Sequence, residues 1–312
     1  MFHRALLLLL LLSALILSRV MAPAAIGATD DRSGGIDLRD AVGSPSACAD
    51  RTTTPRLIPP QDSVTLPILM YHHIKQLPPK ASATWRNLTV SPQAFEAQLR
   101  YLAEQGYHTI YFSELIAYFN AGASLPEKPI ILTFDDGWID HYTVVYPLLQ
   151  KYCMVGTFFP PVNWVENGNG KQVISWEMIE EMSRGGMEFG SHTLNHHLLT
   201  GQTEKQIMAQ LVDSKAALEQ HTGKPVVVFA YPGGGHNALA VSLTAKAGYE
   251  AAVGIMAGVE QTRDDLFLLH RITVPYSDDL KTFAARIRSK RPPPFLPGSS
   301  LWPDPRSELA DR

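Results

Sequence analysis

The sequence predicts an α/β protein whose core is a distorted (β/α) barrel of about seven parallel strands. Short apolar segments alternate with segments of helical length, and repeated β–α units of this kind are typical of a parallel sheet covered by helices. No glycine-rich dinucleotide fingerprint follows the first apolar segment, which disfavours an open nucleotide-binding sheet. So many parallel strands close into a barrel more readily than they form an open sheet, and we therefore favour the barrel.

The predicted strands are short runs of apolar and β-branched residues that end at polar or turn-forming residues. The run Pro129–Phe134 is apolar at nearly every position, as expected of a parallel strand that is buried on both faces. In chain order the predicted strands occupy residues 66–71, 108–112, 129–134, 157–159, 187–191, 226–231, 251–255 and 268–274.

The predicted helices lie between these strands and are amphipathic. The helix that begins at Ser91 places three apolar residues on one face before Gly106 ends it. Ser113 and Ser175 are the expected N-caps of two further helices. In chain order the predicted helices occupy residues 91–105, 113–119, a segment that ends at 152, 175–185, 204–221, 238–247 and 277–288.

Both ends of the chain lack the alternating pattern of the middle. Residues 1–28 have the pattern of a signal peptide, with a basic start, seven consecutive leucines and a small-residue cleavage site. Retention of this segment as a membrane anchor is the alternative, and membrane contact is expected only in that case. Residues 29–63 are predicted to form a flexible linker, 64–290 the folded domain and 291–312 a proline-rich tail. We expect an exported protein, extracellular or associated with the cell envelope.

The composition limits the possible partners. The formal net charge of -3 gives no electrostatic argument for binding nucleic acid or an anionic membrane surface. Neutral glycans and small molecules remain open as partners. The two cysteines, Cys48 and Cys153, lack the spacing of a zinc site. We expect the protein to be a monomer.

Two adjacent carboxylates, Asp135 and Asp136, follow the most apolar strand within the motif T-F-D-D-G. Carboxylates this close repel each other, and folded proteins tolerate the repulsion where one binds a cation or transfers protons. A surface turn is the alternative, since Asp-Gly is common in turns. From this motif alone both interpretations remain open.

His192 and His196 lie four residues apart after another predicted strand, in the motif S-H-T-L-N-H. On a helical turn this spacing points both imidazoles to one side, as in helices that present two ligands to a metal. Histidine pairs also occur as capping or core groups, so the spacing alone is a weak signal. With one carboxylate of the first motif, the two histidines would form the three-ligand, open site of a catalytic zinc or similar divalent ion. The neighbouring His197 is expected to point elsewhere.

Two more predicted strands end in unusual residues. Tyr71 and His72 close the first strand, and the run Ala230–Gly235 contains a tyrosine, a proline and three glycines. The alternatives are a polar strand end and a plain loop, although such a loop could also bring its backbone close to a flat ligand. Four strand ends therefore carry polar or backbone chemistry, and active groups of parallel barrels lie at that end of the strands.

On these motifs the chain resembles the polysaccharide deacetylases of the NodB-homology group, also called carbohydrate esterase family 4. T-F-D-D-G at 133–137 and S-H-T-L-N-H at 191–196 match the two most specific blocks of that family in the right order. The resemblance covers residues 64–290. It implies a NodB-type distorted barrel and a hydrolase that deacetylates amino sugars or, in some members, acetylated xylan.

The resemblance also implies a role for each matching residue. It implies Asp135 as the general base and, as the metal ligands, Asp136, His192 and His196. The implied ion is a divalent metal, with zinc preferred and cobalt, nickel or iron also compatible with such ligands.

The chain departs from the commonest family pattern at two places. Ala230 stands where the family has the arginine that orients the base, which implies a different orientation of Asp135. The late histidine block, at His270, continues as in a subgroup in which that histidine is not catalytic. This subgroup, which is similar to deacetylases of exported poly-N-acetylglucosamine, has a Tyr-His pair after the first strand and uses that histidine as the acid. We therefore favour His72 over His270 as the general acid.

The function implied by the resemblance is metal-dependent removal of N-acetyl groups from an N-acetylglucosamine-type polysaccharide of the envelope or the extracellular space. The candidate substrate-binding residues are Trp138, Tyr231, Pro232 and Gly233, with Trp164 as a further sugar-stacking candidate. Core packing is the alternative for the aromatic side chains. Two other functions stay open, namely an O-acetyl esterase acting on acetylated glycan and a non-catalytic glycan-binding relative.

Overall fold

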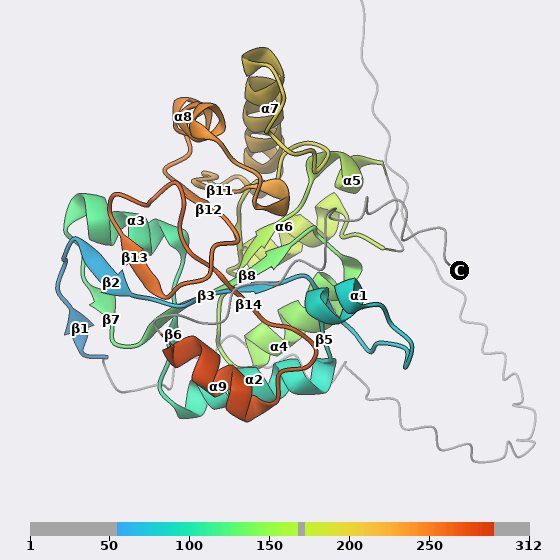
Figure 1. The fold of residues 1–312 in the computed structure, drawn as a ribbon, viewed down its shortest axis with the longest axis vertical. Helices are drawn as coiled ribbons and strands as arrows, with labels where there is room; N and C mark the ends of the chain where they lie inside the picture. The colour runs from blue at the N-terminus through green and yellow to red at the C-terminus, as the bar shows by residue number, and fades with distance from the viewer. Residues whose placement is uncertain (1–54, 168–171, 290–312) are drawn as a thin grey trace, which may run out of the picture. The chain divides into compact units, whose positions relative to one another are not determined.

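The structure is a computed structural model that describes residues 55–167 and 172–289 (Figure 1). The described residues do not include the predicted signal peptide, the predicted linker up to residue 54 or the predicted tail after residue 290. Within the part of the chain that is described, no helix is long and apolar enough to cross a membrane.

Parallel strands form the central sheet, and their bounds are β3 Ile68–Tyr71, β8 Pro129–Asp135, β9 Thr157–Phe159, β10 Glu188–Phe189 and β14 Ile272–Thr273. Their order across the sheet is β10, β9, β8, β3, β14. A further strand, β6 (His108–Thr109), pairs with the start of β8. The strand β8 is buried along its whole length, as its apolar sequence predicts.

A second parallel pair completes a closed ring. Its two strands are β11 (Val228–Ala230) and β12 (Ala251–Val253). Single bridges join this pair to the sheet on either side: Ser191, after β10, pairs with Phe229, and Val253 pairs with Leu269, shortly before β14. The five strands of the sheet and these two strands give a ring of seven parallel strands. The predicted distorted barrel is confirmed, and the two single bridges are its narrowest lateral contacts.

The helices have the bounds α1 Ala83–Leu88, α2 Pro92–Glu104, α3 Phe112–Ala121, α4 Tyr146–Lys151, α5 Val162–Glu166, α6 Trp176–Arg184, α7 Glu204–Thr222, α8 Ala238–Lys246 and α9 Leu280–Arg288. A π-helix, η3 (His141–Val145), precedes α4, and a 3-10 helix, η4 (Pro232–Gly234), follows β11. The predicted caps Ser91 and Ser175 each accept a hydrogen bond from an amide of the first turn. The predicted cap Ser113 is wrong, because α3 begins at Phe112. In Figure 1, α2 and α9 lie side by side below the sheet.

Three short strand pairs lie outside the ring and were not predicted. They are β1 (Leu57–Ile58) with β7 (Leu125–Pro126), β2 (Ser63–Thr65) with β13 (Glu260–Thr262), and β4 (His73–Ile74) with β5 (Thr89–Val90). The first two pairs include residues before 64, so the paired structure begins earlier in the chain than the predicted domain boundary. The amide of Glu127 also donates to the carbonyl of Arg56 at 2.8 Å.

Alternate residues of the ring strands face opposite sides. On β8, Leu132 and Phe134 belong to an apolar cluster that includes side chains of α2, α4 and α9. Ile131 belongs to a second cluster, which combines side chains of α3 with side chains from strands on several sides of the ring, including Ile68, Val228, Ala230, Val253 and Leu269. Residues contributed from several sides of a ring mark its interior. The first cluster therefore lies outside the barrel and the second inside it.

Candidate active site and metal-binding cluster

Strand alternation brings the predicted base and the predicted acid to the inside of the ring. Asp135 is an even number of residues after Ile131 on β8, and His72 is an even number after Ile68 on β3. Ile68 and Ile131 pair directly with each other, and both belong to the interior cluster. Asp135 and His72 are almost completely buried, with exposed fractions of 2% and 3%.

An arginine holds Asp135 by a two-point salt bridge. Arg271 lies one residue before β14, and its Nη1 and Nη2 atoms donate to Oδ1 and Oδ2 of Asp135, both at 2.8 Å. The same guanidinium donates from Nε to the carbonyl of Gly254 at 2.8 Å and from Nη1 to Oγ1 of Thr133 at 3.2 Å. Burial acts to raise the pKa of Asp135, but Arg271, His192 and His72 together outweigh it and the pKa is lowered. The carboxylate is therefore held ionised and in one orientation.

The role of this arginine was not predicted from the sequence, because the family pattern places an arginine at position 230. Ala230 leaves that position without a charge, and Arg271 supplies the charge from a different strand. The available signal was a single arginine inside the apolar segment L-L-H-R-I-T-V, which was itself predicted as a strand. A charge in a buried strand needs a partner of opposite sign, and Asp135 is that partner.

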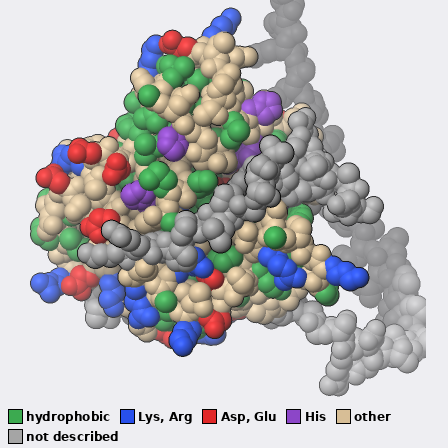
Figure 2. Space-filling view, in the orientation of Figure 1, with side chains coloured by type: hydrophobic (Ala, Val, Ile, Leu, Met, Phe, Trp, Pro, Cys, Tyr) green, Lys and Arg blue, Asp and Glu red, His purple; other side chains and the backbone are tan. Residues whose placement is uncertain are grey.

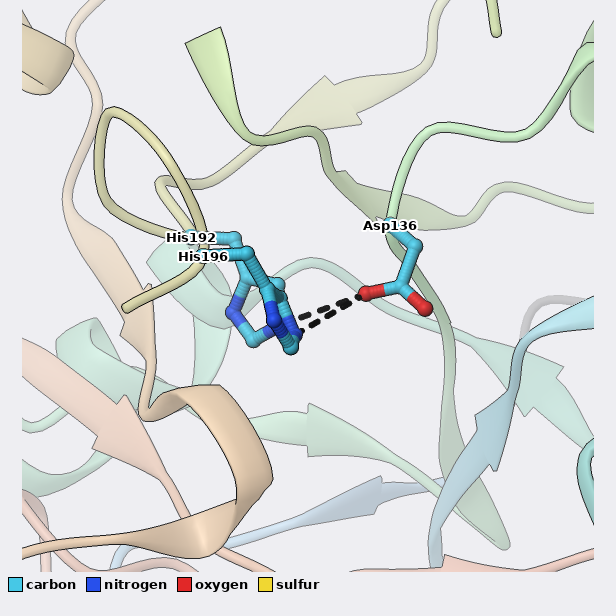
Figure 3. A group of neighbouring side chains, drawn as sticks. All are labelled: Asp136, His192 and His196. Atoms are coloured by element: carbon cyan, nitrogen blue, oxygen red, sulfur yellow. Dashed lines mark ion pairs between the residues drawn. The ribbon is translucent and has the colours of Figure 1, made fainter. Parts of the chain in front are cut away.

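Asp136, His192 and His196 come together, and Figure 3 shows both imidazoles turned toward the carboxylate. Nε2 of His192 lies 3.5 Å, and Nε2 of His196 3.3 Å, from Oδ1 of Asp136. One ligand atom from each of the three residues lies within 4.8 Å of the others. Burial acts to raise the pKa of Asp136, but His196 and His192 outweigh it and hold the pKa well below its usual range.

Left-handed backbone conformations produce this convergence. Asp136 has φ +76° and Gly137 has φ +66°, so the chain turns sharply where β8 ends. A Cβ on Gly137 would lie 2.8 Å from Cβ of Pro160, which leaves room only for glycine. The predicted helical turn between the two histidines is wrong. Thr193 (φ +67°) and His196 (φ +60°) reverse the chain in a loop instead, and the loop brings both rings to the same place.

The ligand atoms fit a divalent cation. Nδ1 of His192 lies 2.7 Å from the carbonyl oxygen of Ala230, which can only accept, so a neutral ring carries its lone pair on Nε2. That lone pair faces Oδ1 of Asp136, which is buried and has no hydrogen-bond partner of suitable geometry within the described part of the chain. Two electron-pair donors turned toward each other repel unless a cation lies between them. Two imidazoles and one carboxylate are a ligand set that zinc favours and that several other divalent metals accept.

The two candidate acids lie in different surroundings. Burial lowers the pKa of His72 to about 4, although the nearby charges of Asp136 and Asp135 act to raise it. His270 is half-buried, and its Nδ1 lies 3.0 Å from the carbonyl oxygen of Glu260 on β13. The charges that act most strongly on Asp135 are those of Arg271, His192 and His72. His72 therefore lies beside the carboxylates, while His270 is engaged with β13.

The predicted sugar-stacking role of Tyr231 does not match its position. Val228 and Ala230 face the barrel interior, so Phe229 and Tyr231 face the outer layer by strand alternation. The ring of Tyr231 is fully buried there and has no face open to a sugar. The next residue, Pro232, is buried as well. Gly233 in η4, another predicted substrate-binding residue, is partly exposed.

Two tryptophans border the cluster. Trp138 is 9% exposed, and its Nε1 donates to Oδ2 of Asp136 at 3.2 Å, so it orients the carboxylate through the oxygen that does not face the histidines. Trp164 is half-buried, and its ring centroid lies 5.4 Å from that of His196. Figure 2 shows one face of the molecule, where histidine and apolar side chains share the upper half and Lys and Arg lie mostly along the lower edge.

Comparison with known proteins identifies the family. Residues 122–252 match the family model described as polysaccharide deacetylase. The chain is 30% identical over 226 residues to YxkH, a polysaccharide deacetylase homologue of Bacillus subtilis (strain 168), and the match covers 72% of this chain and 77% of YxkH. The Streptococcus pyogenes deacetylase PplD, solved in complex with acetate, has a TM-score of 0.67 and 29% identity, covering 76% of this chain and 100% of PplD. The chain therefore belongs to the polysaccharide deacetylase family, as predicted.

Within that family the chain is related to poly-N-acetylglucosamine deacetylases. It is 25% identical over 293 residues to the poly-beta-1,6-N-acetyl-D-glucosamine N-deacetylase of Escherichia coli (strain K12). That match covers 78% of this chain and 43% of the Escherichia coli enzyme, so the chain spans less than half the length of this relative.

Proposed function

We propose that the protein is a metal-dependent N-deacetylase that acts on an N-acetylglucosamine-type polysaccharide of the cell envelope or the extracellular space. The observation that carries the proposal is the cluster of Asp136, His192 and His196 next to the ionised Asp135, where the carboxyl ends of β8 and β10 meet. The relation to poly-N-acetylglucosamine deacetylases supports the substrate class. The signal-peptide pattern at the start of the sequence supports export.

Asp135 is the proposed general base. A divalent ion held by Asp136, His192 and His196, with zinc preferred, would polarise the acetyl carbonyl and make water easier to deprotonate. Both oxygens of Asp135 accept from Arg271, and each keeps a further lone pair that can take the proton of the attacking water. Because Arg271 already fixes the carboxylate, no rearrangement is needed before the proton moves.

His72 is the proposed general acid. Hydrolysis breaks the bond between the acetyl carbon and the sugar nitrogen, and an amine anion is a very poor leaving group. The nitrogen must therefore receive a proton as the bond breaks. His72 lies on the interior face beside both carboxylates, whose charges act to raise its pKa, and it has to be in its protonated form to serve as the acid. The products are acetate and a free amino sugar.

Acetate release from N-acetylglucosamine oligomers by the full chain tests this proposal. We expect release to be lost after chelation and restored by zinc or cobalt, because water needs the ion to become a nucleophile. His196→Ala should abolish both stoichiometric metal binding and release. His197→Ala, at the exposed neighbouring histidine, should change neither. Stoichiometric metal binding without any acetate release would contradict the proposed substrate.

The same assay distinguishes the two acids and the two acetyl linkages. His72→Ala should lower kcat by about 10²–10⁴-fold at unchanged metal content, which is the usual contribution of a general acid. His270→Ala is the matched control and should retain most of the activity. Loss of activity in the His270 variant alone would move the acid role to that residue. Faster release from an O-acetylated glycan than from the N-acetylated oligomer would support the esterase instead.

A further inference from the structure

His72 lies between two paired strands, because β3 ends at Tyr71 and β4, which pairs with β5, begins at His73. The pairing of β3 with β8 ends at Tyr71, which lies opposite Phe134, so His72 is the first residue beyond it. Nε2 of His141 lies 2.6 Å from the carbonyl oxygen of His72. A carbonyl can only accept, so the ring of His141 donates this hydrogen bond.

The next residue back along the chain, Asp140, holds the other side of the same segment. Its Oδ2 accepts from the amide of Ile74 at 2.9 Å and lies 3.3 Å from Nδ1 of His73. Asp140 and His141 are adjacent at the start of the π-helix η3. The start of η3 therefore holds the segment His72–Ile74 at both ends, in addition to the pairing of β4 with β5. We call Asp140 and His141 the clamp.

Burying the polar side chains of the clamp costs free energy of folding. His141 is fully buried and Asp140 is 7% exposed. Nδ1 of His141 and Oδ1 of Asp140 are both buried and make no hydrogen bond within the described residues. A buried polar atom without a partner costs about 1–3 kcal/mol. Apolar side chains of similar size would fill the same space without this cost, and π-helices themselves occur frequently at functional sites.

The clamped segment also contacts the wall of the metal-binding cluster. The ring of His73 lies between Trp138, with 4.3 Å between ring centroids, and Trp85, at 4.9 Å. Trp138 is the residue whose Nε1 donates to Asp136. The segment that carries His72 is thus fixed to the same side chains that fix the predicted metal ligand, so small shifts in it would change the distance from His72 to the reacting nitrogen.

The geometry points to Asp140 and His141 as positioning residues for the general acid: they fix the backbone at the carbonyl of His72 and at the amide of Ile74, and so the point from which the imidazole of His72 delivers a proton. This inference rests on the proposed function, in which His72 protonates the leaving amine. It separates two kinds of substrate. An amide needs that proton, whereas an aryl ester such as 4-nitrophenyl acetate loses a stable phenolate without it.

Parallel kinetics on the two substrates test the inference. His141→Leu removes the donor, and we expect kcat on the N-acetylglucosamine oligomer to fall by about tenfold or more, since a small misplacement of a reacting group has effects of this size. KM, metal content and turnover of 4-nitrophenyl acetate should stay within about twofold of wild type. His141→Gln places an amide N–H near the position of Nε2 and should restore much of the lost kcat on the oligomer.

Three further variants complete the test. Asp140→Asn keeps an oxygen that can accept from Ile74 and should behave like the glutamine variant, whereas Asp140→Leu should behave like His141→Leu. Thr143→Val, at an exposed position of the same π-helix, is the matched control and should leave both activities unchanged. Equal losses on both substrates, loss of metal, or no loss at all in His141→Leu would overturn the inference. Absence of acetate release from the oligomer by the wild-type protein would instead remove the proposed function on which it rests.

Discussion

Arg271 can be 1% exposed inside the ring because its hydrogen-bonding groups are used there. Its Nε and both Nη atoms donate, to Gly254, Thr133 and Asp135. Removing a charge from water costs several kcal/mol, and a partner repays this only when the geometry is good and the remaining donors are satisfied. The planar fork of arginine meets both conditions, and the single ammonium of lysine would not.

Arg271→Ala should destabilise the protein by about 3–5 kcal/mol, because it leaves the buried carboxylate of Asp135 without its counter-charge. Urea unfolding measures the loss. Arg263→Ala is the control, because that arginine forms an exposed pair with Asp62 at 3.4 Å and should cost at most about 1 kcal/mol. The double variant Arg271→Met with Asp135→Asn removes both charges and should be less destabilised than Arg271→Ala. Similar stabilities for the two arginine variants would show that the buried pair contributes little.

At the scale of elements, the start of α3 is capped by a strand as well as by its own sequence, in which Glu114 accepts from the amide of Tyr111 at 2.8 Å. Glu188 on β10 accepts from the amides of Phe112 at 3.1 Å and Ser113 at 3.4 Å, and from the hydroxyl of Thr157 at 2.7 Å. The expectation that Ser113 caps this helix considered only neighbours in the sequence. A carboxylate from a distant element can also accept hydrogen bonds from the free amides at the start of a helix, and no local sequence pattern predicts such a partner.

The ionisation of Glu188 should make stability depend on pH. Burial raises the pKa of this carboxyl group, so folding disfavours its charged form. The neutral form of Glu188 contributes its full share to the free energy of unfolding below the ordinary glutamate pKa of about 4.3. That contribution is lost as the pH rises through the raised pKa of the folded protein. Glu188→Gln cannot ionise, so its Tm relative to wild type should increase between about pH 4 and pH 7. Glu104→Gln, at an exposed position of α2, should show a constant difference, and a constant difference for Glu188→Gln would refute the effect.

At the scale of the whole molecule, segments far apart in the sequence tie the N-terminal part of the domain to the barrel. β1 pairs with β7, β2 pairs with β13, and the buried hydroxyl of Tyr118 donates to the carbonyl of Pro59 at 3.0 Å. These contacts begin before residue 64. A fragment cut at the predicted boundary would lose β1 and leave the Tyr118 hydroxyl without this acceptor.

A fragment of residues 64–290 should therefore be less stable than one of residues 55–290. The buried hydroxyl alone accounts for about 1–3 kcal/mol, and thermal unfolding compares the two fragments. Tyr118→Phe removes the hydroxyl and should recover part of the loss in the shorter fragment, while it should not stabilise the longer one. Equal Tm values for the two fragments would place the boundary where the sequence predicts it.

The sequence was sufficient for the barrel and for the strand ends that carry the cluster, because both follow from local patterns. The apolar run before Asp135 predicts a buried strand, and a parallel barrel collects its strand ends on one side. The position of a side chain could not be predicted from the sequence where it depends on a partner that is distant along the chain. Arg271, the Glu188 cap and the loop between His192 and His196 all result from tertiary contacts. Tyr231 is an intermediate case, since alternation from Ala230 would have placed it outside the barrel.

The pairing of Asp135 with Arg271 also changes how catalytic activity should be inferred from the sequences of related proteins. An aligned column with alanine in place of arginine suggests a weakened catalyst when each position is scored by itself. Here the positive charge reaches the same carboxylate from the far end of the domain, through the strand that closes the ring beside β3. The carboxylate requires a positive charge at one location in space, and side chains from more than one strand of the barrel can reach that location. Sequences with alanine at the equivalent of position 230 are therefore best sorted by whether an arginine precedes the last strand.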